Sequence, residues 1–439
     1  MEVLKFGGTS VGSAQKLKNL LPIIKNDKQR IVVLSAMAGT TNLLTEISEK
    51  LYGGLREDAS KLIDDLHRSY QEVLKELLED KNLVSEGTEM LSAHFSYIRS
   101  FTLKSFTFKE EKAILAQGEL LASALFHLYC IEQDADASLM PALNFMRIDK
   151  DGEPDYFYIR ENIKRELKEH SESKIIITQG YICRNAYGEI DNLKRGGSDY
   201  TATIIGAAIM ADEVQIWTDI NGVHNNDPRV VENTSVIRQL SFDEAAELAY
   251  FGAKILHPTS VNPARDANIP VRLKNTLNPD DEGTIIRANT KEKGYRAVAA
   301  KDGITVIKIK SDRMLLAYGF LRKVFEIFEI YKTPIDMIST SEIAVSLTID
   351  DATNLDKIER DLKNLGSLEI ERDRTIICIV GDFIAENKGT TLDIFNALKE
   401  TPIRMISYGG SRHNVSVVVD TSHKKKALNS LSDKLFRKA

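Results

Sequence analysis

The chain opens on Val3-Leu4-Lys5-Phe6-Gly7-Gly8-Thr9-Ser10, and this stretch decides the fold. An apolar run that ends in two glycines predicts a short strand, a tight turn and a helix that begins near Ser13. Paired glycines let backbone N–H groups come close to a phosphate, and Lys5 would add a positive charge beside them. A plain tight turn explains the same residues about as well. The stretch is neither a Walker A loop nor a GxGxxG dinucleotide motif.

Four more apolar runs alternate with helical stretches in the part of the chain up to residue 285. The runs cover residues 31–35, 175–179, 214–218 and 269–273. Continuous apolar runs of this length are typical of strands buried on both faces of a parallel sheet. Apolar residues at helical spacing predict helices over residues 55–78 and 110–130, and residues 202–211 are interpreted as a buried helix. Strands that alternate with helices predict an α/β layered fold with its ligands at the carboxyl ends of the strands.

Beyond a charged stretch around residues 291–294 the chain repeats itself. Thr333-Pro334-Ile335-Asp336-Met337-Ile338-Ser339 matches Thr401-Pro402-Ile403-Arg404-Met405-Ile406-Ser407 in six of seven positions, at a spacing of 402 − 334 = 68 residues. Two unrelated pieces that share a turn are the alternative. Duplication explains better why the identities fall within the same order of strands and helices. The C-terminal part is therefore predicted to be two tandem βαββαβ units.

Composition excludes several classes of function. Hydrophobic residues make up 43% and charged residues 28%, which is ordinary globular usage. The formal net charge is -6, so a general attraction to nucleic acid or to an anionic membrane is not expected. Cys130, Cys183 and Cys378 form no CxxC pair, which excludes a zinc cluster or a disulfide framework and fits a reducing cytosol. We expect a cytoplasmic protein with neither a secretory signal nor a membrane span.

Arg195-Gly196-Gly197-Ser198-Asp199 repeats the glycine turn just before the helix expected near Tyr200. Ser198 or Asp199 would serve as a helix N-cap in the simplest interpretation. That interpretation leaves Arg195 unexplained. A guanidinium beside exposed N–H groups suits a carboxylate or a phosphate, because it binds both oxygens at once.

Further segments carry groups that suit a charged substrate. Trp217-Thr218-Asp219 ends a predicted strand, Asp227-Pro228-Arg229 lies in the loop beyond, and Phe251-Gly252-Ala253-Lys254 places a lysine at a helix end. His257 is better explained as a packing or capping group than as a catalytic base. Glu119 lies on an otherwise apolar helix, either as a solvated edge or as a partner for an ammonium, and Thr41 follows the small-residue loop after the second strand. Together these groups favour phosphoryl transfer from ATP to an amino acid.

Taken in order, the segments from Lys5 to Val11, from Arg195 to Asp199, the Trp-Thr-Asp and Asp-Pro-Arg motifs and Phe-Gly-Ala-Lys resemble the aspartate kinases (aspartokinases). The repeated units resemble the paired ACT domains of that family, so the resemblance covers essentially the whole chain. It implies the amino acid kinase fold, a three-layer α/β sandwich, followed by two ferredoxin-like ACT units. The implied boundaries are residues 1–285 for the catalytic domain, 286–303 for a linker, 304–373 for the first ACT domain and 374–439 for the second.

The resemblance also implies the activity and its residues. The γ-phosphate of ATP would pass to the β-carboxylate of L-aspartate, with Mg²⁺, to give 4-phospho-L-aspartate and ADP, the first step toward lysine, threonine and methionine. Lys5 would contact the transferring phosphoryl group, and Asp199 would orient Lys5 and the phosphate donors. The implied aspartate contacts are Thr41, Glu119 (ammonium), Arg195 (α-carboxylate) and Ser198. The implied nucleotide contacts are Lys5, Gly7, Gly8, Thr9, Thr218, Asp219, His224, Arg229, Lys254 and Ile255, with His224 where relatives commonly have a tyrosine. No general base is required, because a free Asp side chain titrates at about 3.9.

The repeated units resemble those of the lysine-inhibited, single-function aspartokinases, and from the length we expect no fused homoserine dehydrogenase. The implied effector contacts are Met314, Gly319, Phe320, Leu321, Ile335, Asp336, Thr340, Ser341 and Glu342. Asp336 and Glu342 would meet ammonium groups, while Ala317 stands where that class often has a serine. The alternative is a helix start and a solvated strand edge without a ligand. The expected assembly is a homodimer through the ACT domains, or a tetramer.

Two other functions fit part of the sequence. A kinase for N-acetylglutamate or glutamate would share the nucleotide motifs, but would not normally carry the Glu119 and Arg195 set with two ACT units. A non-catalytic amino acid sensor would keep the repeat and could lose Lys5 and Asp199, both of which are present. Release of ADP with each candidate substrate distinguishes these functions.

Overall fold

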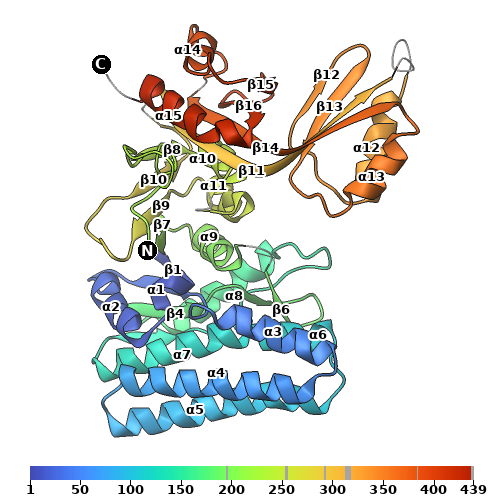
Figure 1. Ribbon diagram of the computed structural model, residues 1–439. Coiled ribbons are helices and arrows are strands. Elements are labelled where there is room, and N and C mark those ends of the chain that lie inside the picture. The colour runs from blue at the N-terminus through green and yellow to red at the C-terminus, as the bar shows by residue number, and fades with distance from the viewer. Residues whose placement is uncertain (194–195, 253–255, 291–292, 312–317, 383, 437–439) are drawn as a thin grey trace. The chain divides into compact units, whose positions relative to one another are not determined.

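A computed structural model describes residues 1–193, 196–252, 256–290, 293–311, 318–382 and 384–436 (Figure 1). The chain divides into two compact units. The first comprises Met1–Val223 and Leu256–Ala288, and the second comprises His224–Ile255 and Asn289–Ala439. The second unit therefore includes a segment that lies inside the predicted catalytic domain of residues 1–285. The functional boundaries of the domains stay a prediction.

The first unit alternates strands with helices, as the apolar runs predict. Its strands are β1 (Glu2–Phe6), β2 (Arg30–Leu34), β3 (Ala137–Leu139), β4 (Ile175–Gln179), β5 (Ile182–Arg184), β6 (Ile190–Asn192), β7 (Glu213–Thr218), β9 (Val271–Asn275) and β10 (Thr284–Arg287). Its helices are α1 (Gly8–Val11), α2 (Ala14–Ile24), α3 (Thr40–Tyr52), α4 (Arg56–Leu77), α5 (Lys81–Ser100), α6 (Phe108–Leu115), α7 (Gln117–Glu132), α8 (Tyr156–Glu169), α9 (Gly197–Ile209) and α11 (Asn262–Asp266). The helix expected near Ser13 is α2, which Ser13 caps, but the short α1 precedes it.

Parallel pairing brings the carboxyl ends of the central strands to one edge of the sheet. Within the first unit the strand order is β3-β4-β2-β1-β7-β9-β10. Phe6, the last residue of β1, lies opposite Leu34 of β2 and Trp217 of β7, and Leu34 lies opposite Gln179 of β4. The loops that follow these strands therefore emerge side by side.

Helices cover both faces of this sheet. On one face α7 packs against β2, β3 and β4, and α4 and α5 form an outer pair against α3 and α7 (Figure 1). On the other face α9 packs against β1, β2 and β7, with α8 and α11 against it. The arrangement is the predicted three-layer α/β sandwich.

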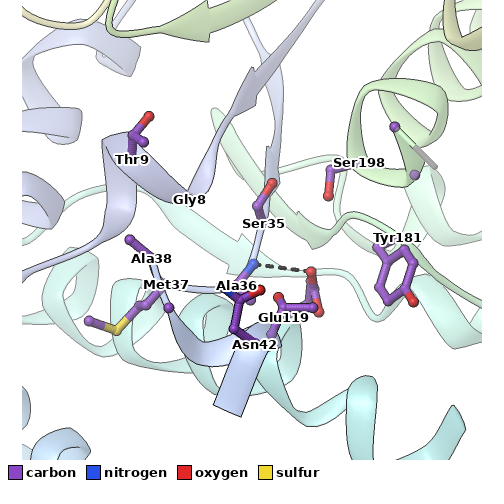
Figure 2. Close-up of a pocket in the computed structure, with 14 residues that line it drawn as sticks. Gly8, Thr9, Ser35, Ala36, Met37, Ala38, Asn42, Glu119, Tyr181 and Ser198 are labelled. Atoms are coloured by element: carbon purple, nitrogen blue, oxygen red, sulfur yellow. Dashed lines mark hydrogen bonds between the residues drawn. The ribbon is translucent and has the colours of Figure 1, made fainter. Parts of the chain in front are cut away.

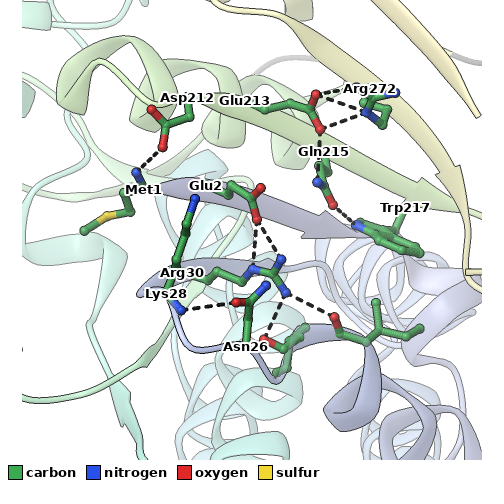
Figure 3. Close-up of polar contacts among 12 residues, drawn as sticks. Met1, Glu2, Asn26, Lys28, Arg30, Asp212, Glu213, Gln215, Trp217 and Arg272 are labelled. Atoms are coloured by element: carbon green, nitrogen blue, oxygen red, sulfur yellow. Dashed lines mark hydrogen bonds and ion pairs between the residues drawn. The ribbon is translucent and has the colours of Figure 1, made fainter. Parts of the chain in front are cut away.

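Charged pairs join the amino-terminal ends of the strands, opposite the edge where the loops emerge (Figure 3). Arg30 Nη2 of β2 lies 2.8 Å from Glu2 Oε2 of β1, and Arg272 Nη2 of β9 lies 2.8 Å from Glu213 Oε2 of β7. Each pair bridges two neighbouring strands. These charges at the amino-terminal ends are thus paired with each other, whereas a ligand is expected at the carboxyl ends of the strands.

Length and apolar character alone would let one stretch of the described residues, Phe108–Glu132, cross a membrane. This stretch contains the helix predicted over residues 110–130. Most of it lies inside the unit, with 78% of its apolar window buried, as expected for a core helix.

The second unit is built on one sheet that both copies of the repeat share. The strands of this sheet are β11 (Gly294–Lys310), β12 (Ile338–Thr340), β13 (Ala344–Ile349), β14 (Ser367–Asp382), β15 (Ile403–Tyr408) and β16 (Asn414–Asp420). The unit also contains β8 (Gln239–Ser241), which is not part of this sheet. Its helices are α10 (Phe242–Tyr250), α12 (Phe320–Ile330), α13 (Leu355–Leu362), α14 (Thr390–Ala397) and α15 (Lys424–Leu435). The sheet order is β12-β13-β11-β14-β16-β15, so the two repeated segments end in the outermost strands, β12 and β15.

The long strands β11 and β14 connect the two copies. The two strands pair with each other along their whole length. The Thr305–Lys310 half of β11 also pairs with β13, and the Arg374–Val380 part of β14 also pairs with β16. The second copy therefore borrows Gly294–Lys301 from a stretch that was predicted to be part of the linker, because these residues pair with residues 376–382. The duplication and the ferredoxin-like element order are as predicted.

Candidate active site

A cavity of about 480 Å³ opens at the carboxyl ends of β1, β2 and β4. Three helices begin at its wall: α1 contributes Gly8 and Thr9, α3 contributes Thr41 and Asn42, and α9 contributes Gly197 and Ser198. The first N–H groups of a helix have no acceptor within the helix, and the helix dipole is positive at that end. Three such ends around one cavity favour a ligand that carries several negative charges.

Glu119 is the carboxylate of this cavity (Figure 2). The Ala36 N–H donates a hydrogen bond to its Oε1 at 3.1 Å, while Oε2 is buried and has no hydrogen-bond partner among the described residues. Gly118 makes this approach possible, because a Cβ there would lie 2.7 Å from the Cβ of Ala36. Burial raises the pKa of Glu119 to about 8, against the opposing effects of the Ala36 hydrogen bond and of Lys5. A buried carboxylate with a free oxygen is suited to bind an ammonium group.

Lys5 and Asp199 form an ion pair beside the cavity. Lys5 Nζ, at the end of β1, lies 2.6 Å from Asp199 Oδ1 in the first turn of α9, and both side chains are mostly buried. Lys5 also folds back toward the glycine turn, since a Cβ on Gly7 would lie 3.4 Å from its Nζ. The Lys5 ammonium is thus held beside α1, next to the glycine turn that the sequence predicts to bind phosphate.

Tyr181 lines the cavity and was missed by the sequence analysis. Its backbone has a φ of 66°, in the left-handed region that large residues seldom adopt. The Tyr181 N–H donates to Thr201 Oγ1 at 2.9 Å, and its carbonyl accepts from Leu193 N at 2.7 Å, which holds the conformation. Burial, together with the charge of Glu119, raises the pKa of Tyr181 to about 12. Its position just after β4 was the available signal, because parallel strands place ligand contacts there.

Three of the four predicted aspartate contacts and two residues of the predicted phosphate-binding turn come together in this cavity. Gly8, Thr9, Thr41, Glu119 and Ser198 line it, and the remaining lining residues are Ser35, Ala36, Met37, Ala38, Gly39, Asn42, Tyr181, Gly196 and Gly197. Gly7 caps α1 immediately beside them. Arg195, predicted to bind the α-carboxylate, lies outside the described residues.

Comparison with known proteins decides the family. The amino acid kinase family matches residues 1–275, and an ACT domain matches residues 377–435. The lysine-sensitive aspartokinase 3 of Escherichia coli (strain K12) is 33% identical over 447 aligned residues, which cover 99% of each chain. The chain belongs to the aspartokinases. Solved structures agree: E. coli aspartokinase III in complex with aspartate and ADP has a TM-score of 0.82, and the same enzyme in complex with lysine and aspartate has 0.84, each at 32% identity and covering 100% of both chains.

The predicted nucleotide residues of this aspartokinase are divided between the two units. Thr218 ends β7 in the first unit and Asp219 follows it, and the Thr218 hydroxyl donates to Asp219 Oδ1 at 3.1 Å. His224 and Arg229 belong to the second unit. His224 Nδ1 lies 2.8 Å from Thr234 Oγ1, and burial lowers the pKa of His224. Arg229 is highly exposed and forks onto Asp227 at 2.8 Å. Lys254 and Ile255 lie outside the described residues, so a common nucleotide site stays a prediction.

The predicted effector residues of the aspartokinase lie in the first ACT copy. Gly319 caps α12 with a φ of 81°, Phe320 and Ile335 belong to one apolar cluster, and Leu321 is exposed at the helix surface. Thr340, Ser341 and Glu342 are exposed at the end of β12. Met314 lies outside the described residues. Asp336, predicted to meet an effector ammonium, is already paired with the chain's own Lys301 at 2.9 Å.

Proposed function

We propose that this aspartokinase transfers the γ-phosphate of ATP to the β-carboxylate of L-aspartate, giving 4-phospho-L-aspartate and ADP. The observation that carries the proposal is the buried Glu119 Oε2, which has no hydrogen-bond partner among the described residues, in a cavity at which three helices begin. That combination suits a ligand with one ammonium group and several negative charges. The complex of E. coli aspartokinase III with aspartate and ADP supports the same pair of ligands. The product would enter the synthesis of lysine, threonine and methionine.

Each ligand group of aspartate has an assigned partner in this proposal. The ammonium meets Glu119 Oε2, the α-carboxylate meets Arg195, and Thr41 and Ser198 hold the substrate from the ends of α3 and α9. Gly7, Gly8 and Thr9 bind phosphate oxygens through their N–H groups. Thr218, Asp219, His224, Arg229, Lys254 and Ile255 contact the rest of the nucleotide.

The chemical difficulty is to bring one anion to another. The β-carboxylate is already ionised at neutral pH, so the protein needs to supply positive charge rather than a base. Lys5 and the N-termini of α1 and α9 supply it where charge develops on the transferring phosphoryl group, and Asp199 fixes the direction of the Lys5 ammonium. Mg²⁺ would enter with the substrate as MgATP. The described residues hold no group of three or more His, Cys, Asp or Glu side chains able to bind a metal ion, and Mg²⁺ is typically bound by substrate phosphates with one or two carboxylates.

The proposal is tested by measuring ADP release with aspartate, glutamate and N-acetylglutamate in turn. We expect release with aspartate and at most a few per cent of that rate with the other two. Faster release with N-acetylglutamate, which lacks the free ammonium that Glu119 would bind, would replace the proposed substrate. No release with any of them would favour an amino acid sensor.

Binding of aspartate is expected to release a proton. Because the pKa of Glu119 is raised to about 8, the free protein at pH 7 holds this carboxyl mostly protonated, and a bound ammonium favours the ionised form. Titration calorimetry in buffers of different ionisation enthalpy should give close to one proton released per aspartate at pH 7. At pH 9, above the raised pKa, only about a tenth of a proton should be released per aspartate. Equal release by the wild type and by Glu119→Gln would assign the proton to another group.

We further propose that lysine inhibits the enzyme through the ACT copies. A solved structure of E. coli aspartokinase III contains lysine together with aspartate, which supports the same effector here. The proposed contacts are the nine effector residues named from the sequence, from Met314 to Glu342. Initial rates with lysine and with threonine, added separately, test this. Indifference to both would reject feedback control.

The assembly and the location of the enzyme are also proposed from the sequence. We propose a homodimer through the ACT copies, or a tetramer, in the cytoplasm. The solution mass of the purified protein distinguishes a monomer, a dimer and a tetramer.

A further inference from the structure

Helix α10 carries polar contacts to the ACT strands at every turn. Glu244, Glu247 and Tyr250 are spaced three residues apart, so they lie along one side of the helix. Glu244 Oε1 lies 3.2 Å from Arg296 Nε of β11, and the Asn414 amide of β16 donates to Glu247. The helix is therefore attached to the strands that both ACT copies share, although its sequence lies within the predicted catalytic domain.

Tyr250, the last residue of α10, contacts two charged residues that also contact each other. The Tyr250 hydroxyl donates to Asp336 Oδ1 at 3.1 Å, and Lys301 Nζ lies 4.7 Å from the centre of the Tyr250 ring. Lys301 Nζ also lies 2.9 Å from Asp336 Oδ1 and 2.7 Å from Asp350 Oδ2. We call Tyr250, Lys301, Asp336 and Asp350 the α10 latch.

The chain just after α10 is held against the same strand. Gly252 has a φ of 119°, and a Cβ there would lie 2.4 Å from the Ala300 carbonyl oxygen, one residue before Lys301. Only glycine allows this approach. Strand β11 therefore contacts the residues on both sides of Phe251, through Lys301 at Tyr250 and Ala300 at Gly252.

The latch holds two carboxylates and one ammonium, so its negative charge would attract one more cation. Asp336 is 2% exposed, and its Oδ2 has no hydrogen-bond partner among the described residues. Burial would lower the pKa of Lys301, but its hydrogen bonds with Asp350 and Asp336 raise it overall. Two carboxylates therefore share one ammonium. A second ammonium at Asp336 would stand close to Lys301 and repel it where little water screens the charges.

We infer that Tyr250 is a positioning residue for ATP, and that the α10 latch transmits occupancy of the first ACT copy to the nucleotide-binding segment. The inference rests on the proposed function, which assigns Lys254 and Ile255 to ATP and Asp336 to the effector ammonium. An ammonium at Asp336 Oδ2 repels Lys301 toward Asp350, so Tyr250 loses the cation beside its ring and shares its acceptor carboxylate with the new cation. The end of α10 is then held less firmly, and ATP binds more weakly. Aspartate, whose cavity lies in the first unit, should be unaffected.

Tyr250→Phe tests this inference, because it removes one hydroxyl and keeps the ring. We expect the KM for ATP to rise about three- to tenfold, in line with the loss of one hydrogen bond, while kcat and the KM for aspartate change less than twofold. Lys301→Met should do the same or more. The matched control is Lys308→Met on the same strand, whose pair with Glu369 is 3.9 Å long and exposed, and it should leave all three constants within twofold.

Lysine supplies the second readout. Calorimetry should show that lysine binds to Tyr250→Phe as it binds to the wild type, whereas lysine no longer raises the KM for ATP. An unchanged KM for ATP in Tyr250→Phe, or equal rises in both KM values, would overturn the role of the latch. If lysine has no effect on the wild type, both the proposed feedback and the transmission step are rejected. The KM for ATP of Tyr250→Phe without lysine still tests whether Tyr250 positions the ATP-binding segment. If aspartate is not the substrate, the Kd for ATP from calorimetry replaces the KM.

Discussion

Lys5→Met is expected to lower kcat about a thousandfold while the protein stays folded. Methionine keeps the length and apolar stem of the side chain and removes only the ammonium, which is held 2.6 Å from Asp199. A positive group directed at the transferring phosphoryl group stabilises charge that develops only in the transition state, so its loss falls on kcat rather than on binding. Removal of one such group typically costs a factor of about 10² to 10³, and more when it contacts the phosphoryl group directly.

The measurement is the initial rate at saturating ATP and aspartate, with urea unfolding of both proteins. Lys112→Met is the matched control, because Lys112 pairs with Asp191 in the same unit at 3.5 Å and both side chains are buried to a similar extent. We expect kcat of the control within about threefold of the wild type, since an ion pair outside the reacting centre contributes chiefly to stability. A kcat for Lys5→Met within tenfold of the wild type would remove Lys5 from the transition state.

Glu119→Gln is expected to raise the KM for aspartate about 10- to 100-fold with a smaller change in kcat. Glutamine has the shape of the protonated carboxyl and still accepts the Ala36 N–H, so only the charge that meets the ammonium is lost. A hydrogen bond between charged groups contributes about 1.5–3 kcal/mol, which corresponds to this range. Initial rates with varied aspartate at fixed saturating ATP give both constants.

The stability of the same variant checks the cause. The pKa of Glu119 is raised in the folded state, so the folded protein binds this proton more tightly than the unfolded chain does. The wild type should therefore lose stability as the pH rises from about 5 toward 8, and the loss should be complete above the raised pKa. Glu119→Gln removes this pH dependence and should be at least as stable as the wild type at pH 9. A variant that is both unstable and slow at every pH would indicate a structural role instead.

Local sequence patterns predicted the parallel sheet and much of the cavity. Apolar runs show which residues are buried strands, and parallel pairing then brings residues after those strands together, as happened for Gly8, Thr9 and Thr41. Glu119 was identified because a carboxylate on an apolar helix is unusual. Tyr181 was missed because its place depends on a left-handed turn that Thr201 and Leu193 stabilise from a later part of the chain.

The membership of α10 in the second unit could not be predicted for a similar reason. Nothing in residues 242–250 distinguishes this helix from others of the first 285 residues. Its partners Arg296, Lys301 and Asp336 lie 50 or more residues away, where periodicity gives no information. The effector role predicted for Asp336 likewise took no account of Lys301, which lies on another strand.

The interleaving of the two units limits how such an enzyme can be rebuilt by recombination. A single break between Ala288 and Gly294 would send α10 with the kinase half and its ionic partners with the other half. Glu244 and Tyr250 would lose Arg296 and Asp336, and α10 would lose its packing against β11 and β14. The ACT half therefore cannot be exchanged on its own without the loss of these contacts. A foreign ACT pair would have to arrive with its own version of residues 224–255, or α10 would have to change in step with it.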